Sequence, residues 1–149
     1  MTFDYILEIG HASLGPVVAI LAVAVAYGQY RVQRQKAKSD LFALRFDVYR
    51  RTLRYVQAAR YDSSIPPQIS SEFAAALQEA QFLFDEQLWT SLTNIQEKGV
   101  AISVSLEMIR NTPPEQELSY RYTIQDSKRW MAQAEGQLAG LFNSYLRVR

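Results

Sequence analysis

The feature that most constrains this chain is an uncharged apolar segment near its N-terminus. Residues 9–30 contain no Asp, Glu, Lys or Arg, and their centre is apolar from Gly15 to Val25. As an α-helix these 22 residues would span roughly 33 Å at about 1.5 Å per residue, which matches a hydrocarbon core about 30 Å thick. The sequence therefore predicts a transmembrane helix over residues 9–30.

A cleaved signal peptide is the main alternative for this segment. Its Ala-Val-Ala triplets at residues 22–26 suit a cleavage site, but Asp4 and Glu8 precede it and no Lys or Arg does, which is the reverse of a signal peptide. Buried helices of soluble proteins are usually shorter. A helix lying on a membrane surface needs a continuous polar face, which residues 12–26 lack. A membrane span is the preferred interpretation.

The flanking charges predict the orientation of the segment. Nothing basic precedes it except the amino terminus, and Lys and Arg accumulate on the cytoplasmic side of membrane spans. We therefore expect a single-pass protein of a bacterial inner membrane, with residues 1–8 in the periplasm and residues 31–149 in the cytoplasm. The basic residues that follow the segment, and that we expect to contact anionic lipid headgroups, are Arg31, Arg34, Lys36 and Lys38.

Small residues recur at four-residue spacing along the same helix. Small side chains let a second helix approach closely in lipid, where packing drives association. Because Ala is frequent in membrane helices in any case, the spacing alone does not demand a partner. We expect an integral membrane protein or complex to pack here, with a homo-oligomer as the alternative. The positions concerned are Gly15, Ala19, Ala22, Ala26 and Gly28.

Hydrophobic spacing after the segment is helical. Apolar residues from Phe42 to Val56 recur in steps of three and four, and no Pro or Gly interrupts residues 29–64. The first helix is therefore expected to continue without a break to about Tyr61. The segment Asp62-Ser-Ser-Ile-Pro-Pro ends it.

The rest of the chain carries further amphipathic helices. One begins near Ser70 or Ser71, and Asp85 either caps the next helix or marks a bend in a single one. The last runs from about Glu117 to Leu146. The stripe between these two comprises Leu88, Leu92, Ile95, Gly99, Ile102, Leu106 and Ile109. Residues 31–149 are thus predicted to be an all-α, antiparallel bundle of about four helices.

Charge is strongly segregated along these helices. Residues 31–61 carry nine Lys or Arg against Asp40 and Asp47, whereas residues 62–118 carry nine Asp or Glu against Lys98 and Arg110. Neighbouring helices of opposite charge would attract one another, so complementarity within the bundle is the simplest interpretation. The acidic part also disfavours nucleic acid as a partner.

The sequence contains little that points to chemistry. It has no cysteine, and its one histidine, His11, cannot build a multi-histidine metal site. A histidine in a membrane helix can bind haem, but an interfacial role is the simpler interpretation. Adjacent acids such as Asp85 and Glu86 are common at helix starts. We expect no enzyme activity, no metal and no cofactor.

Two segments resemble a known group of proteins. The first is Lys38-Ser-Asp-Leu-Phe-Ala-Leu-Arg-Phe-Asp-Val-Tyr49, which follows a hydrophobic span and a basic stretch, and the second is Phe82-Leu-Phe-Asp-Glu86 with the stripe after it. Together they are similar to uncharacterised bacterial single-span inner-membrane proteins with a cytoplasmic helical domain. The resemblance implies a bacterial inner-membrane protein and carries no activity with it.

These observations favour an accessory or scaffold subunit of a bacterial membrane protein complex. The alternative is a self-associating membrane-anchored sensor or effector, for example in stress or phage defence. Aromatic residues dominate the energetics of protein interfaces, although packing in the core is the simpler role for each. The candidate protein contacts are Trp89, Trp130, Tyr120 and Tyr122.

Overall fold

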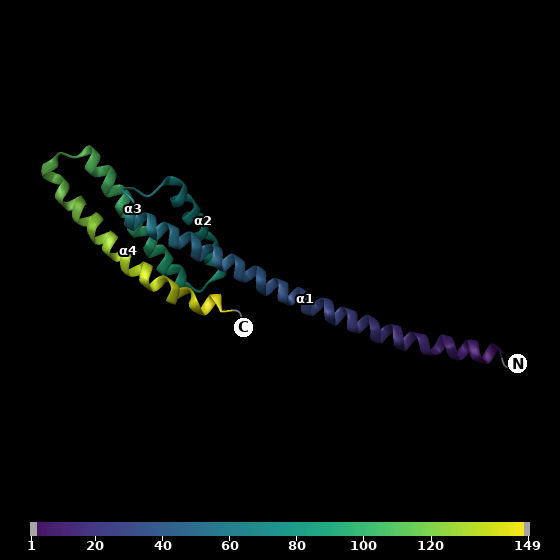
Figure 1. Ribbon diagram of the computed structural model, residues 1–149. Helices are drawn as coiled ribbons and strands as arrows, with labels where there is room; N and C mark the ends of the chain where they lie inside the picture. Colours follow the sequence, from purple (N-terminus) through teal and green to yellow (C-terminus); the bar gives the residue numbers. More distant parts are fainter. Residues whose placement is uncertain (1–2, 148–149) are drawn as a thin grey trace. The chain divides into compact units, whose positions relative to one another are not determined.

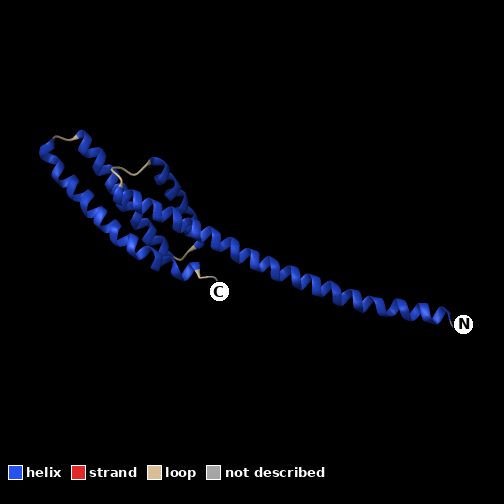
Figure 2. Ribbon diagram, in the orientation of Figure 1, coloured by secondary structure: helices blue, strands red, loops and turns tan. Residues whose placement is uncertain are grey.

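The computed structural model describes the backbone of residues 3–147 and the side chains of residues 18–147. The described residues form four α-helices and one short 3-10 helix, and no strand occurs among them (Figure 1 and Figure 2). The prediction of an all-α fold with four helices is confirmed. The elements are α1 (Phe3–Tyr61), α2 (Pro67–Leu83), α3 (Glu86–Asn111), η1 (Pro114–Gln116) and α4 (Glu117–Leu146).

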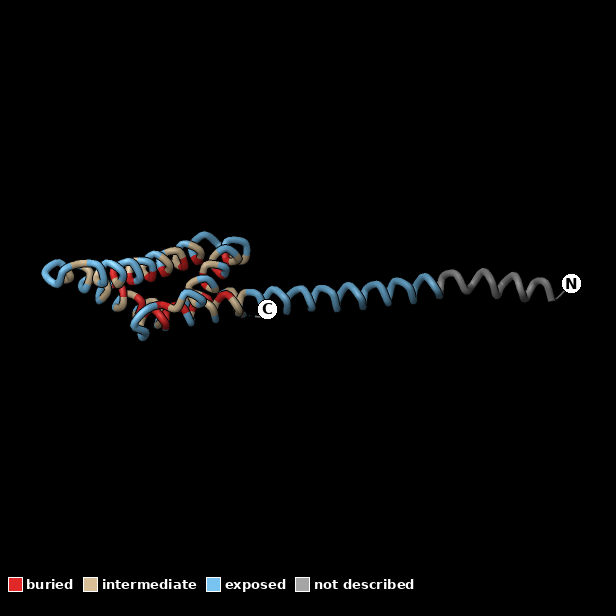
Figure 3. The backbone as a smooth tube through the Cα atoms, turned by 90° about the horizontal axis from the view of Figure 1, so that it is seen from above, coloured by how far each residue is buried: buried red, intermediate tan, exposed pale blue. Residues whose placement is uncertain are grey.

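The chain divides into two compact units between Leu41 and Phe42, and α1 runs through both. We call the first unit the arm. Its described side chains, residues 18–41, are all exposed (Figure 3). We call the second unit, from Phe42 onward, the bundle. The unbroken course of α1 to Tyr61 confirms the predicted continuation of the first helix.

The prediction of a transmembrane helix over residues 9–30 is wrong. Among the residues that could be searched, no helix combines the length and the apolar character needed to cross a membrane. In the part of α1 whose side chains are described, charged residues recur from residue 31 onward, at Arg31, Arg34, Lys36 and Lys38. The predicted location, a single-pass protein of an inner membrane with a periplasmic and a cytoplasmic side, depends on that transmembrane helix and is therefore wrong as well.

The core of the bundle consists of large apolar side chains from all four helices (Figure 3). α1 contributes Val48, Tyr55 and Val56, and α2 contributes Phe73 with small alanines beside it. Burial of one such side chain stabilises the fold by roughly 1.5–3 kcal/mol. α3 and α4 contribute the longest series: Leu88, Leu92, Ile95, Ile102, Met131, Leu138 and Phe142.

α3 and α4 lie side by side as an antiparallel hairpin, with η1 in the connection (Figure 1). The predicted stripe of α3 is buried from Leu88 to Ile102, and Gly99 is buried within it. Gly99 is required by a neighbour on α1. A Cβ atom there would lie 2.0 Å from the hydroxyl oxygen of Tyr55 and 2.6 Å from its Cζ atom. The glycine therefore lets α1 pack closely against α3.

The starts of α2 and α3 are explained by the residues at each boundary. α2 begins at Pro67, earlier than the predicted Ser70, because a proline at the first helical position already has the required φ angle and lacks an N–H that would be unpaired there. Asp85 caps α3 by accepting a hydrogen bond from the backbone N–H of Leu88 at 3.0 Å. α2 and α3 are therefore separate helices.

Ion pairs connect the basic part of α1 to acidic residues on its neighbours. The Arg51 guanidinium donates to both carboxylate oxygens of Glu79 on α2, at 3.1 and 2.5 Å. Arg54 donates to Glu72 on α2 at 3.0 Å. The complementarity expected from the charge blocks is thus present between α1 and α2.

Candidate functional site

The strongest candidate for a binding site is a groove on the outer surface of the α3–α4 hairpin. It has a volume of about 160 Å³. No residue of α1 or α2 is among those found to line it. The lining residues are Ser91, Asn94, Ile95, Trp130, Gln133, Ala134, Gln137 and Leu141. We call them the open groove.

Polar side chains of the open groove have spare hydrogen-bonding capacity. Within residues 18–147, the amides of Asn94, Gln133 and Gln137 make no side-chain hydrogen bond, and each amide can both donate and accept. Ser91 donates to the backbone carbonyl of Gln87 at 2.9 Å. The half-buried ring of Trp130 packs against the core beside these amides. The groove is suited to an uncharged polar surface.

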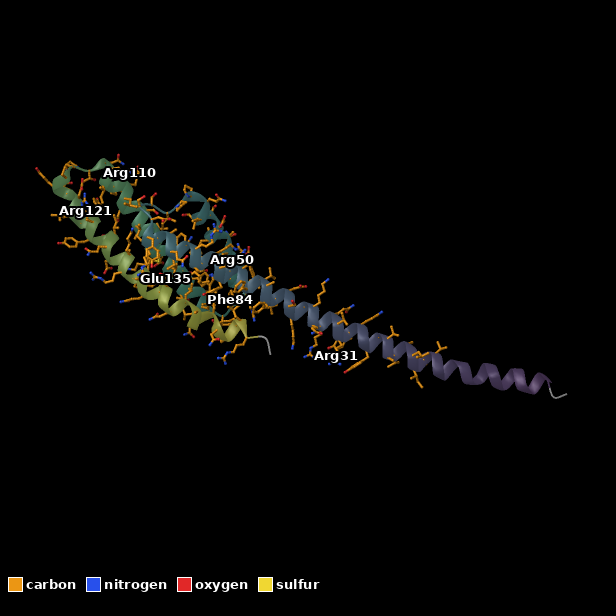
Figure 4. All side chains as sticks on the ribbon, in the orientation of Figure 1. Arg31, Arg50, Phe84, Arg110, Arg121 and Glu135 are labelled. Carbon is orange, nitrogen blue, oxygen red and sulfur yellow. The ribbon has the colours of Figure 1, made fainter. Side chains whose placement is uncertain are left out.

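The surroundings of the open groove carry almost no charge. Residues 87–96 of α3 contain no charged side chain, and residues 130–146 of α4 contain only Glu135. Glu135 points toward α1, where it accepts hydrogen bonds from Arg60 at 2.6 Å and Gln57 at 3.1 Å (Figure 4). These bonds, chiefly that from Arg60, lower the pKa of Glu135. Charge resumes directly beyond these runs, at Glu97 of α3 and Arg129 of α4.

A second cluster surrounds Arg45, near the start of the bundle. Arg45 donates to the backbone carbonyls of Leu83 at 3.3 Å and Tyr145 at 3.4 Å, and its guanidinium lies 5.9 and 5.8 Å from the ring centroids of Phe84 and Tyr145. The Tyr145 hydroxyl donates to Asp85, which lowers the pKa of the Asp85 carboxyl. The cluster joins α1 to the ends of α2 and α4 and the start of α3, so its role is to hold the fold.

A third feature is a pocket of about 460 Å³ toward the α3–α4 turn. Its apolar floor is Leu106, Ile109 and Ile124, and Arg121 and Lys128 stand at its edge. Lys128 donates to the backbone carbonyl of Asp62 at 2.9 Å, where α1 has just ended. Figure 4 shows Arg121 and Arg110 near the turn. The pocket lies where no third helix continues beside the hairpin.

Predicted site residues of the arm are exposed wherever their side chains are described. This holds for Ala19, Ala22, Ala26 and Gly28, and a Cβ atom on Gly28 would meet nothing within 4 Å. The side chain of His11 and the surroundings of Gly15 lie outside the described part of the chain. The basic positions Arg31, Arg34, Lys36 and Lys38 are likewise exposed. Their contact with anionic lipid is not tested by the structure and stays a prediction.

The four aromatic candidates differ in their burial and in their contacts. Trp89 and Trp130 are half-buried and pack against the core, so packing accounts for part of each. Trp130 also lines the open groove. Tyr120 is half-buried, whereas Tyr122 is 68% exposed. The structure brings none of the other three into the open groove.

The described side chains were also compared with the requirements of a metal site. Within that part of the chain, no three His, Cys, Asp or Glu side chains gather closely enough to hold a metal ion.

Sequence reasoning did not single out the open groove, because its residues are ordinary amides on two different helices. One signal was present: the charge-free run over residues 87–96 and its nearly charge-free counterpart over residues 130–146. The predicted resemblance to bacterial single-span proteins is not tested by comparison with known proteins. No protein-family model, curated protein or solved structure matches this chain.

Proposed function

We propose that this protein is an accessory or scaffold subunit of a protein complex, and that its arm binds helices of another protein. One observation carries the proposal: the arm exposes large apolar side chains around its whole circumference. Each is between 59% and 69% exposed. They are Val18, Ile20, Leu21, Val23, Val25, Tyr27, Tyr30 and Val32.

A helix that is apolar on every side is normally buried against other helices, and large exposed apolar patches mark interaction sites. Burial of the six aliphatic side chains in this set would contribute on the order of 10 kcal/mol. Association of two proteins costs roughly 4–15 kcal/mol in lost freedom. A partner must therefore cover most of the arm, which favours a helical groove over a single contact.

The residues next to the apolar part support a partner of particular charge. Arg31, Arg34 and Lys36 are exposed within six residues of one another. Opposite charges across an interface steer association and fix its register. The partner surface is expected to be apolar with acidic groups at one end.

The proposal is tested by purifying the full-length chain from its source cells in a mild detergent and measuring complexes by native mass spectrometry. We expect a second protein at fixed stoichiometry. The variant Val25→Asp places a charge in the exposed apolar part of the arm and is expected to abolish this complex.

The matched control is Val104→Asp, which places the same charge at an exposed valine of α3 and is expected to keep the complex. Absence of any heterologous partner, or equal loss in both variants, would contradict a scaffold role. Absence of a heterologous partner together with loss of self-association on Val25→Asp would instead favour the self-associating effector.

A further inference from the structure

We propose that the pocket toward the α3–α4 turn binds a small aliphatic carboxylate, which is a molecule with one acidic group on an apolar chain. We call it the tip pocket, and its lining residues are Leu106, Ile109, Arg121, Ile124, Gln125 and Lys128. This inference goes beyond the proposed function, because it concerns the bundle and a small ligand, and not the arm and a partner protein.

The tip pocket lies on a side of the hairpin that α1 covers elsewhere. The Arg60 guanidinium pairs with Glu135 of α4 at 2.6 Å, and Lys128 of α4 donates to the backbone carbonyl of Asp62 at 2.9 Å, directly after α1 has ended. The α3–α4 hairpin extends beyond this end of α1 (Figure 1). Lys128 also lines the tip pocket, so the pocket begins where the cover of α1 stops.

The floor of the tip pocket is aliphatic. Leu106 and Ile109 of α3 and Ile124 of α4 are half-buried and line it. Ligand sites usually measure about 300–1,000 Å³ and combine apolar walls with a few polar groups, and the tip pocket, at about 460 Å³, fits both descriptions. None of its lining residues is aromatic, so no flat surface is offered to a planar ring. A flexible aliphatic chain suits this floor.

The polar edge of the tip pocket is positive. Its charged lining residues are Arg121 and Lys128, and no acidic residue is among those that line it. Arg121 donates to Glu117 at 3.0 and 2.6 Å, so Glu117 balances the charge of Arg121. Lys128 donates to a neutral carbonyl and makes no ion pair with a carboxylate in the described part of the chain. The unbalanced charge at the pocket is therefore that of Lys128.

Lys128 is suited to bind a carboxylate at this edge. An ammonium group has three N–H donors, and the bond to the carbonyl of Asp62 uses one of them. Lys128 is half-buried, so solvent ions screen its charge less than that of an exposed lysine. The exposed amide of Gln125, one turn before Lys128, can donate to the same group. A carboxylate held here places its aliphatic chain against the floor.

The proposal is tested by nuclear magnetic resonance on the full-length chain with labelled isoleucine methyl groups. The probe is decanoate, and the δ-methyl signals of Ile109 and Ile124 are expected to shift and to saturate. Ile20 reports on the exposed arm, which can adsorb aliphatic chains. Decanol has the same chain without the charge, and it is expected to bind at least about tenfold more weakly, a difference of about 1.4 kcal/mol. Equal affinities, or shifts at Ile20 alone, overturn the proposal.

Variants of two adjacent residues separate the tip pocket from a general effect of charge. Lys128→Glu reverses the charge at the pocket, and Arg129→Glu makes the same change at the next residue, which is exposed and is not among the lining residues. We expect Lys128→Glu to weaken decanoate binding at least about tenfold and Arg129→Glu less than about twofold.

A milder pair of variants keeps the test valid if Lys128→Glu perturbs the fold. Lys128→Met removes the charge and keeps an apolar stem, whereas Lys128→Arg keeps the charge. We expect Lys128→Met to weaken decanoate binding and Lys128→Arg to retain most of it. Binding that is unchanged in Lys128→Met, or weakened equally in Lys128→Glu and Arg129→Glu, overturns the proposal.

Discussion

Gly99 is the position where the bundle has least room for a side chain. The contact with Tyr55 described above leaves no space for a methyl group, and overpacking of a core costs about 1–3 kcal/mol. We expect Gly99→Ala to lower the free energy of unfolding by that amount, measured by urea denaturation followed by circular dichroism. Adding Tyr55→Phe, which removes the nearest atom, should recover part of the loss. A Gly99→Ala variant as stable as the wild type would show that Tyr55 moves freely.

Three carboxyl groups make stability depend on pH. Hydrogen bonds from Arg60 lower the pKa of Glu135, and the Tyr145 hydroxyl lowers that of Asp85. Burial raises the pKa of Asp47, but bonds from Arg50 and the charge of Arg51 outweigh it and the pKa is lowered. As pH falls, these carboxyl groups therefore take up protons at a higher pH in the unfolded chain than in the folded protein. Stability is full above the unfolded pKa values of about 4 and is lost below them.

Glu135→Gln tests this dependence. Since the ion pair with Arg60 is partly exposed, we expect the variant to lose at most about 1 kcal/mol at pH 7. The difference from the wild type should shrink as pH falls from about 5 toward 3, because the wild-type carboxylate becomes protonated there. Glu107→Gln, which removes the exposed ion pair with Arg110 and weakens an exposed contact with Asn111, both within α3, serves as the control. A difference that does not change with pH would contradict the assigned cause.

At the scale of elements, α3 depends on one side chain at its start. Asp85 accepts from the Leu88 N–H and from the Tyr145 hydroxyl, so it caps α3 and joins it to α4. We expect Asp85→Ala to lower the thermal midpoint, and Asp85→Asn, which caps equally well, to preserve most of it. In the Asp85→Ala background, Tyr145→Phe should add little, because the hydroxyl has already lost its acceptor. Additive losses would show that the two contacts are independent.

The elements also show what sequence reasoning can reach. Periodicity predicted the course of α1 to Tyr61 and the bounds of α4, because each depends on local spacing and local breakers. The cluster around Arg45 was not predicted, because the hydrogen-bond acceptors of Arg45 are backbone carbonyls, and every residue type carries one. The open groove was missed because it exists only once α3 and α4 are paired. The membrane prediction failed because, in the part of the chain that could be searched, Arg31 and the basic residues after it reduce the apolar character of α1.

At the scale of the whole molecule, the arm and the bundle are expected to differ in stability. Among the residues whose side chains are described, every buried core residue, from Val48 to Phe142, lies in the bundle. We expect brief chymotrypsin digestion to cut first after Tyr27 or Tyr30, which are exposed, and to leave a resistant fragment beginning near Phe42. The fragment should unfold at the same urea midpoint as the intact chain. Early cleavage at Tyr55, or a lower midpoint, would show that the bundle needs the arm.

The cluster around Arg45 has a consequence for how the protein folds during synthesis. Arg45 and the carbonyl of Tyr145 are separated by 100 residues in sequence. At about 5–20 residues per second, a ribosome needs on the order of 5–20 seconds to synthesise that interval. The residues of α1 therefore leave the ribosome that much earlier than the side chains of α4 that will cover the apolar stripe of α1. The arm is therefore exposed to other proteins of the cell before the bundle has folded, and a partner present during synthesis can bind the arm first.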